Sequence, residues 1–321
     1  MWIIIGESMN GIEPPKRKEL PRARDRITFL YVEYCRLEKE DSAVRIICDN
    51  GTIDVPAGML MVLLLGPGTT VTHRMVQIAS ESGMELVWVG EQGVRFYAGG
   101  SVLSGNTSLL ISQAKIVSNQ HLRLAAAKRM YHIRYPQDDF KELSMRQLLG
   151  REGRHVGERY IELAELYNLT WNGRRYNPDT FSENELLQNA LSCANSCLYG
   201  ICYAVIYSLG LSPGLGIVHT GLTKSFVLDI ADIYKEQLTF PVAFSTTAKF
   251  MNEKINEPID RSIRRSMRDI FKDSRFLKVI VSDIENVLGD KDEPSCDEGR
   301  NLLWAGFMDN INGTVQYGRR K

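Results

Sequence analysis

The sequence lacks an excess of charge of either sign. Its 321 residues contain 39 lysines and arginines and 39 aspartates and glutamates. A net charge of zero argues against a uniformly basic nucleic-acid-binding protein, but it is compatible with a local basic face, because the field depends on where the charges lie. Among the 6 cysteines there is no Cys-x-x-Cys pair, which excludes a zinc ribbon and a thioredoxin-like redox motif.

Long apolar runs are also missing. The longest, residues 57–66, is far shorter than the roughly 20 residues that a membrane-spanning helix needs. The apolar residues 2–5 are followed by Glu7 and preceded by no basic segment, so no secretory signal is predicted. We therefore expect an intracellular protein with no membrane partner. Cys193 and Cys197 lie one helical turn apart and are interpreted as small buried side chains rather than metal ligands.

The hydrophobic pattern divides the chain near residue 100. Before Gly99-Gly100 it has mostly period two, with a hairpin signal at Asp49-Asn50-Gly51; after residue 105 it has helical period. We expect an α+β fold with an N-terminal, mainly antiparallel β domain followed by a larger C-terminal all-α-helical domain. The expected boundaries are 1–100 for the β domain (1–21 loose), 101–289 for the helical domain and 290–321 for a mobile tail. The expected helices of the second domain span 107–135, 144–168, 182–210 and 223–237, with a fifth that starts at Pro258 and a sixth from Ser274 to Gly289.

The segment 219–235 carries the first candidate chemistry. Asp229, Asp232 and Lys235 follow one another at i,i+3 spacing on one face of an otherwise apolar helix, and His219 lies on the preceding glycine-flanked loop. Acidic groups on an apolar helix are costly to bury without a cation. Histidine with aspartate suits a divalent transition metal, and carboxylates suit magnesium or manganese. The alternative is a solvated helix face on which the lysine stabilises the acids.

Glu152 is the second candidate. It lies between Arg151 and Gly153 in a helical pattern that also holds Gly150 and Gly157. Each helical glycine costs about 1 kcal/mol relative to alanine, which makes sense if a ligand or backbone must approach closely. The sequence is compatible with a metal-binding carboxylate beside phosphate-binding arginines, or with a surface Arg–Glu network that contributes little.

Basic residues gather in several stripes. Segment 121–159 has nine lysines and arginines against five acids, and Arg174 and Arg175 lie among aromatic residues in 171–176. Any one stripe is more simply an ordinary solvated face. Several stripes around one acidic cluster instead suggest phosphodiester chemistry in which a cation neutralises charge. The most regular stripe occupies one face of a predicted helix and consists of Arg261, Arg264, Arg265, Arg268 and Lys272.

These strings resemble a known family over about residues 20–290. The run from His219 to Asp232, Glu152 in Gly-x-Glu-Gly, and Ser196-Cys-Leu-Tyr199-Gly are similar to the CRISPR-associated adaptation integrase, the family called "Cas one". Segments 67–73, 88–95 and 171–176 resemble its type I-E branch.

The resemblance implies a prokaryotic, cytoplasmic homodimer that joins a small ferredoxin-like partner, "Cas two". The assembly would capture short foreign DNA, the prespacer, and insert it beside the leader of a CRISPR array. By resemblance, Glu152, His219 and Asp232 would bind one Mg²⁺ or Mn²⁺, supported by Asp229 and Lys235. The residues expected on the path of double-stranded DNA are Arg95, Arg174, Arg175, Tyr176, Tyr199, Arg261, Arg264 and Arg268.

The expected activity is transesterification, in which the 3′-hydroxyl of the incoming DNA attacks a phosphodiester of the repeat. Water in place of that hydroxyl would give nuclease activity from the same centre. Two other readings therefore stay open: a general metal-dependent DNA nuclease and a non-catalytic DNA-binding scaffold.

Overall fold

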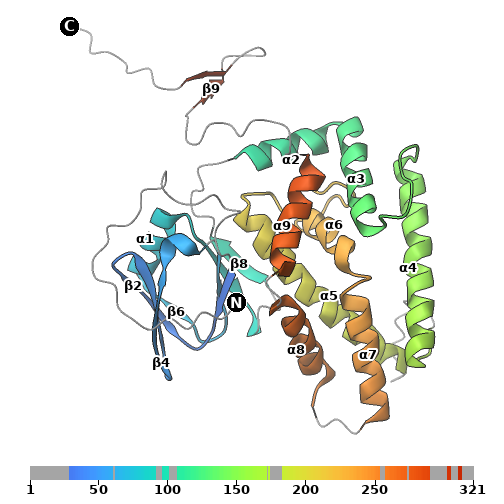
Figure 1. Cartoon of the computed structure of the whole chain (residues 1–321), viewed down its shortest axis with the longest axis horizontal. Helices are drawn as coiled ribbons and strands as arrows, with labels where there is room; N and C mark the ends of the chain where they lie inside the picture. The colour runs from blue at the N-terminus through green and yellow to red at the C-terminus, as the bar shows by residue number, and fades with distance from the viewer. Residues whose placement is uncertain are drawn as a thin grey trace.

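The structure is a computed structural model. It describes residues 29–60, 62–91, 96–100, 107–171, 173, 183–253, 257–272, 275–289, 302–304 and 310–312. Its strands lie mainly in the N-terminal part and its helices in the C-terminal part, and the two regions sit side by side (Figure 1). The predicted α+β class is confirmed. The expected loose segment 1–21 lies outside the described residues.

Two four-stranded sheets form the N-terminal region. One has the order β1-β5-β7-β8 and the other β4-β3-β2-β6. The predicted hairpin is present, because Cys48 pairs with Gly51 across the two-residue turn Asp49-Asn50. The strands are β1 (Phe29–Val32), β2 (Arg36–Glu40), β3 (Ala43–Cys48), β4 (Gly51–Pro56), β5 (Val62–Leu65), β6 (Thr70–Val71), β7 (Glu85–Val89) and β8 (Phe96–Gly100).

The sheets contain more parallel strand pairs than the predicted, mainly antiparallel domain would have. Strand β5 runs parallel to both β1 and β7, and β2 runs parallel to β6. The reason is helix α1 (His73–Ser82), which forms the crossover that a parallel β5–β7 pair requires. Thr72 caps this helix through its hydroxyl, and Gly83 ends it in a left-handed conformation. A turn at Tyr34, with φ of 48°, separates β1 from β2.

The C-terminal region contains eight described α-helices. Helix α4 begins with a capping box of Ser144 and Gln147, and Asn168 ends it in a left-handed conformation. The eight helices are α2 (Ser108–Ser118), α3 (Gln120–Arg134), α4 (Met145–Tyr167), α5 (Glu183–Ser208), α6 (Ser225–Tyr234), α7 (Thr239–Asn252), α8 (Ile259–Lys272) and α9 (Arg275–Leu288).

Three helix predictions are corrected. The expected helix 107–135 is two helices, because Asn119 leaves the helical conformation and its side chain accepts hydrogen bonds from the first amides of α3. Helix α6 begins at Ser225, and Thr223 does not cap it. Helix α7 was not predicted at all; Pro241 lies in its first turn, where a missing amide hydrogen costs nothing.

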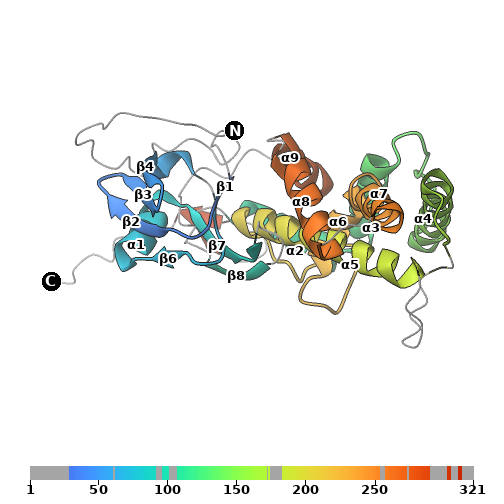
Figure 2. The same ribbon diagram turned by 90° about the horizontal axis from the view of Figure 1, so that it is seen from below.

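Helix α5 joins the two regions. It contacts β7 and β8, and its Ala204 packs with Val62, Leu64 and Val87 on one face of the first sheet. The other face of that sheet packs on α1 and the second sheet, so β5 is buried on both faces. Figure 2 shows α5 reaching from the sheets toward α4, which lies at the far end of the molecule.

By length and composition alone, residues 185–208 of α5 are apolar enough to cross a membrane, but 61% of that window is buried inside the protein. This burial explains the apolar composition as that of a core helix. In the expected tail, β9 (Leu302–Trp304) and β10 (Asn310–Asn312) pair as an antiparallel hairpin.

Candidate active site

Asp229 organises the loop that carries His219. Its side chain is buried at 1% exposure in the middle of α6. Oδ2 accepts hydrogen bonds from the backbone amides of Ile217 and Val218, the latter at 3.1 Å. Oδ1 accepts from the amide of His219 at 2.9 Å and pairs with its Nδ1 at 2.8 Å. Since the carboxylate already accepts all of these bonds, Asp229 acts as the support of the loop.

The same contact fixes the orientation of the His219 ring. A carboxylate only accepts, so Nδ1 carries the proton that it donates to Asp229, and Nε2 presents its lone pair on the opposite side of the ring. Nε2 lies 3.8 Å from Oδ2 of Asp232. The hydrogen bond to Asp229 is the main cause that raises the pKa of His219 above its usual value of 6.5, with Asp232 adding to it. A histidine oriented by a carboxylate in this way is typical of metal ligands.

Lys235 lies beside Asp232. Its Nζ is 2.5 Å from Oδ1 of Asp232 and 5.0 Å from the centre of the Tyr199 ring. Burial is the largest single effect and lowers the pKa of Lys235, but Asp232 and Tyr199 together outweigh it, so the pKa of Lys235 is raised. Asp229, Asp232 and Lys235 therefore share one helix face, as their i,i+3 spacing predicts, and Tyr199 lies at the edge of that face.

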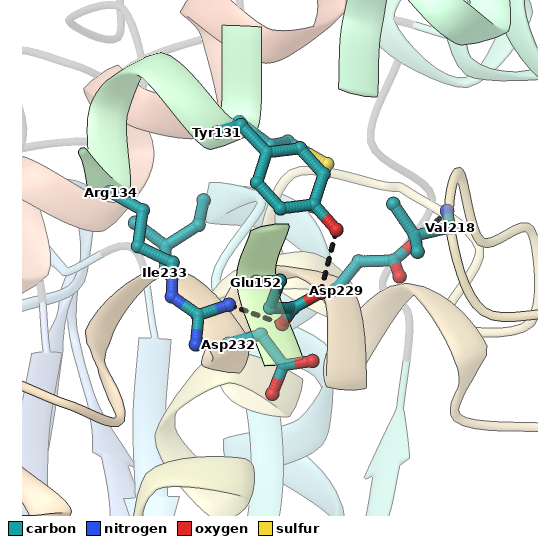
Figure 3. A pocket seen from close by; sticks show the side chains of 8 residues that line it. Tyr131, Arg134, Glu152, Val218, Asp229, Asp232 and Ile233 are labelled. Carbon is teal, nitrogen blue, oxygen red and sulfur yellow. Dashed lines mark hydrogen bonds and ion pairs between the residues drawn. The ribbon is translucent and has the colours of Figure 1, made fainter. Parts of the chain in front are cut away.

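Glu152 reaches the same place from α4. Its Oε2 accepts a hydrogen bond from the Tyr131 hydroxyl at 2.6 Å, and its Oε1 is paired with Arg134. Figure 3 shows Glu152, Asp229 and Asp232 around one pocket. The pocket has a volume of about 20 Å³, which is room for one water-sized particle.

A second acid, the partly buried Glu236, completes this network. Arg134, which is 8% exposed, also donates from Nε to Glu236 Oε1 at 2.9 Å. The Tyr135 hydroxyl donates to the same oxygen. Neither Arg134 nor Glu236 is predicted from the sequence as a site residue. Arg134 was counted in the basic segment 121–159, but the structure buries it between two acids; its i,i+3 spacing from Tyr131 was the available signal.

The loop before α6 is clamped from two further helices. The buried Gln113 side chain of α2 donates to the carbonyls of Ser212 and Leu215 and accepts from the Ser212 amide. Arg123 of α3 donates to the carbonyls of Gly216 and Ile217. The loop therefore holds His219 in one position.

The donor set fits a divalent cation in chemistry and charge. Nitrogen from His219 and oxygen from Glu152 and Asp232 are suitable ligands for Mg²⁺ or Mn²⁺. The site has two more negative than positive charges with His219 neutral, which is the charge that a divalent ion supplies. Within the described part of the chain, no three His, Cys, Asp or Glu side chains converge tightly enough to hold an ion in this conformation. The charged groups are Glu152, Asp229, Asp232 and Glu236 against Arg134 and Lys235.

The helical glycines of α4 face open space. A Cβ built on Gly150, Gly153 or Gly157 meets no heavy atom within 4 Å. Packing within this chain therefore does not require glycine at these positions.

The predicted DNA-contacting residues are partly accounted for. On α8, Arg268 forms an ion pair with Asp269, and Arg265 of the same basic stripe forms one with Glu257. Arg261 and Arg264, by contrast, form no ion pair with the described residues. Four of the predicted residues lie outside the described part of the chain, namely Arg95, Arg174, Arg175 and Tyr176.

The chain is similar to known proteins over most of its length. The profile of the family described as "CRISPR associated protein Cas1" matches residues 132–260. The CRISPR-associated endonuclease Cas1 of Clostridium sp. (strain SY8519) is 40% identical over 93% of this chain and 97% of its own length. The structure described as "Crystal structure of TtCas1-DNA complex" is 36% identical, covers 84% of this chain and 99% of its own, and superposes with a TM-score of 0.73.

A more distant likeness concerns the fold alone. The structure described as "Casposase bound to integration product" is 14% identical, covers 83% of this chain and 97% of its own, and has a TM-score of 0.56. The identity and coverage of the Clostridium relative are high enough to decide the family. The chain belongs to the Cas1 family of CRISPR-associated proteins.

Proposed function

We propose that this chain is a metal-dependent DNA integrase of CRISPR adaptation. The observation that carries the proposal is the pocket lined by Glu152, Asp229 and Asp232, with His219 Nε2 presented toward Asp232. A Mg²⁺ or Mn²⁺ ion held by Glu152, His219 and Asp232 would supply Lewis acidity to a phosphodiester. In this proposal the chain is a member of the type I-E branch of its family. It works as a homodimer inside a prokaryotic cell, together with the small partner "Cas two".

The protein's own groups position the reactants. Asp229 holds His219 in the tautomer that leaves Nε2 unprotonated, and Lys235 forms an ion pair with Asp232. The 3′-hydroxyl of the captured DNA attacks the phosphorus of the repeat, and the 3′-oxygen of the cut repeat strand leaves with the proton. One phosphodiester forms as one breaks, so no side chain serves as the nucleophile.

Basic and aromatic groups would hold the DNA. Arg261 and Arg264 on α8 form no ion pair with a described acid, so their charges are available to phosphates. Tyr199 offers an aromatic face beside Lys235 and Lys224. We expect DNA affinity to fall steeply as salt rises, because each neutralised phosphate releases a counterion. A flat response to salt would contradict this part of the proposal.

A second activity is favoured by a separate observation. The curated relatives of 35–40% identity are named endonucleases. Hydrolysis by the same pocket, with water as the nucleophile, would give nuclease products. The integrase and nuclease are distinguished by whether the cut strand is joined to the added DNA.

A strand-transfer assay tests the proposal. It combines the full-length protein and its small partner with a short duplex bearing free 3′ ends, a supercoiled array plasmid, and Mn²⁺ or Mg²⁺. We expect metal-dependent joined product from the wild type and none from Asp232→Ala, with DNA binding retained. Cutting without joining would favour the nuclease. Salt-sensitive DNA binding without any product would favour the scaffold and refute catalysis.

A further inference from the structure

Arg134 links three elements that meet at the pocket. It ends α3, and its guanidinium bridges Glu152 of α4 and Glu236 of the turn between α6 and α7. With only 8% of its surface exposed, Arg134 has little access to water that could replace either contact. The guanidinium keeps its charge at any working pH, so the two acids are held by one permanent buried cation.

Glu236 is bound through a single oxygen. Its Oε1 accepts from Nε of Arg134 at 2.9 Å, from a second nitrogen of Arg134, and from the hydroxyl of Tyr135. The Tyr135 ring stacks on His155 of α4 at 4.3 Å between centroids, which holds that hydroxyl in place. Glu236 itself does not line the pocket. Any effect of Glu236 on the pocket must therefore pass through Arg134.

The charges explain why a second acid is useful there. An arginine paired with Glu152 alone would cancel its charge and oppose a cation in the pocket. When Arg134 is shared with Glu236, the three groups together carry one negative charge. Arg134 can then orient Glu152, together with the 2.6 Å hydrogen bond from Tyr131, while negative charge remains toward the pocket.

We propose that Glu236 is a positioning residue for Glu152, acting through Arg134, and that it thereby sets the affinity of the pocket for a divalent cation. This inference rests on the proposed function, since it takes Glu152 as a metal ligand. Glu236 touches neither the pocket nor the reacting atoms, so its effect is on the placement and charge of Glu152.

The test is a Mn²⁺ titration of the full-length, metal-free protein, with free Mn²⁺ measured by electron paramagnetic resonance. Glu236→Gln keeps the shape of the side chain and removes its charge. Changes to groups that support metal ligands weaken affinity about tenfold or more, and we expect a loss of that size. The matched control is Glu162→Gln on the exposed face of α4, where Glu162 forms an ion pair with Arg159 and with no other described residue. We expect this control to bind Mn²⁺ as the wild type does.

The outcomes separate this inference from the proposed function. If the wild type binds Mn²⁺, Asp232→Ala abolishes binding and Glu236→Gln equals the control, the inference is overturned and the proposed function stands. If the wild type binds no Mn²⁺, both are overturned. A merely structural role would lower the thermal unfolding midpoint of Glu236→Gln and leave its Mn²⁺ affinity unchanged.

A second variant keeps the inference testable if Glu236→Gln does not fold. Tyr135→Phe removes one donor to Glu236 and retains the aromatic ring that packs on His155. We expect its Mn²⁺ affinity to fall in the same direction by a smaller factor. An affinity equal to that of the wild type in this variant would also overturn the inference.

Discussion

Replacing Asp229 by asparagine should damage both the stability of the fold and the orientation of His219. Each carboxylate oxygen of Asp229 accepts two bonds from the loop 217–219. Asparagine retains one accepting oxygen, and its amide group would face either the amides of Ile217 and Val218 or the amide and ring of His219, whose other tautomer can accept from it. A buried donor left without an acceptor costs about 1–3 kcal/mol, so one or two such donors should cost about 1–6 kcal/mol. That is a large part of the roughly 5–15 kcal/mol that stabilises a typical protein.

The assay is urea unfolding of the metal-free protein, compared with Asp269→Asn as the control. Asp269 is 60% exposed and pairs with Arg268, and such a surface pair contributes about 0–1 kcal/mol. A loss for Asp229→Asn no larger than that of the control would refute the reasoning.

The pH dependence of the same variant gives a second check. Asp229 raises the pKa of His219, so the stability from this contact is fully present below the unfolded value, about 6.5, and is lost as pH rises through the folded value. The stability difference between wild type and Asp229→Asn should therefore be larger at low pH than at high pH. The pKa of His219, followed by nuclear magnetic resonance, should fall in the variant. An unchanged pKa would contradict the structure.

Three further predictions concern the same region. Gly216→Ala should lower the free energy of unfolding in urea by about 1–3 kcal/mol and weaken Mn²⁺ binding. The reason is that a Cβ there would lie 2.3 Å from the His219 carbonyl oxygen and 2.7 Å from Ser225 Cβ. Unchanged binding would show that the loop does not position His219. Gly153→Ala should stabilise α4 by up to about 1 kcal/mol, since its Cβ meets no atom. Under the proposal that a DNA strand approaches this face, the same variant should reduce strand transfer, and undiminished transfer would rule that approach out. Mn²⁺ affinity, measured by titration, should fall as pH drops through the raised pKa of His219, because only the neutral imidazole binds a metal; a pH-independent affinity would exclude His219 as a ligand.

Local signals in the sequence were sufficient for much of the architecture. The capping box at Ser144, the hairpin turn at Asp49-Asn50 and the cap at Thr72 each act within a few residues, and each is present in the structure. The break at Asn119 was missed because the apolar pattern continues across it, and only the side-chain cap on α3 reveals it. The parallel pairing of β5 depends on contacts between distant strands, which no local pattern determines.

Local spacing also predicted part of the candidate site. The helical spacing of Asp229, Asp232 and Lys235 places them on one face, and the structure shows that face in contact with His219. The separate roles of the two aspartates were not predictable from spacing. Asp229 is the buried support because the loop 217–219 folds back onto it, and this depends on clamps from α2 and α3 far along the chain. The pairing of Arg134 with Glu236, 102 residues away, is likewise a product of the tertiary fold.

The central claim is that Glu152, His219 and Asp232 together hold the ion that serves the reaction. An anomalous difference map from crystals of the full-length protein grown with Mn²⁺ tests it most directly. We predict one strong peak in the pocket, bonded to His219 Nε2 and to the carboxylates of Glu152 and Asp232. A peak that does not contact Glu152, or the absence of any peak in this pocket at saturating Mn²⁺, would contradict the account.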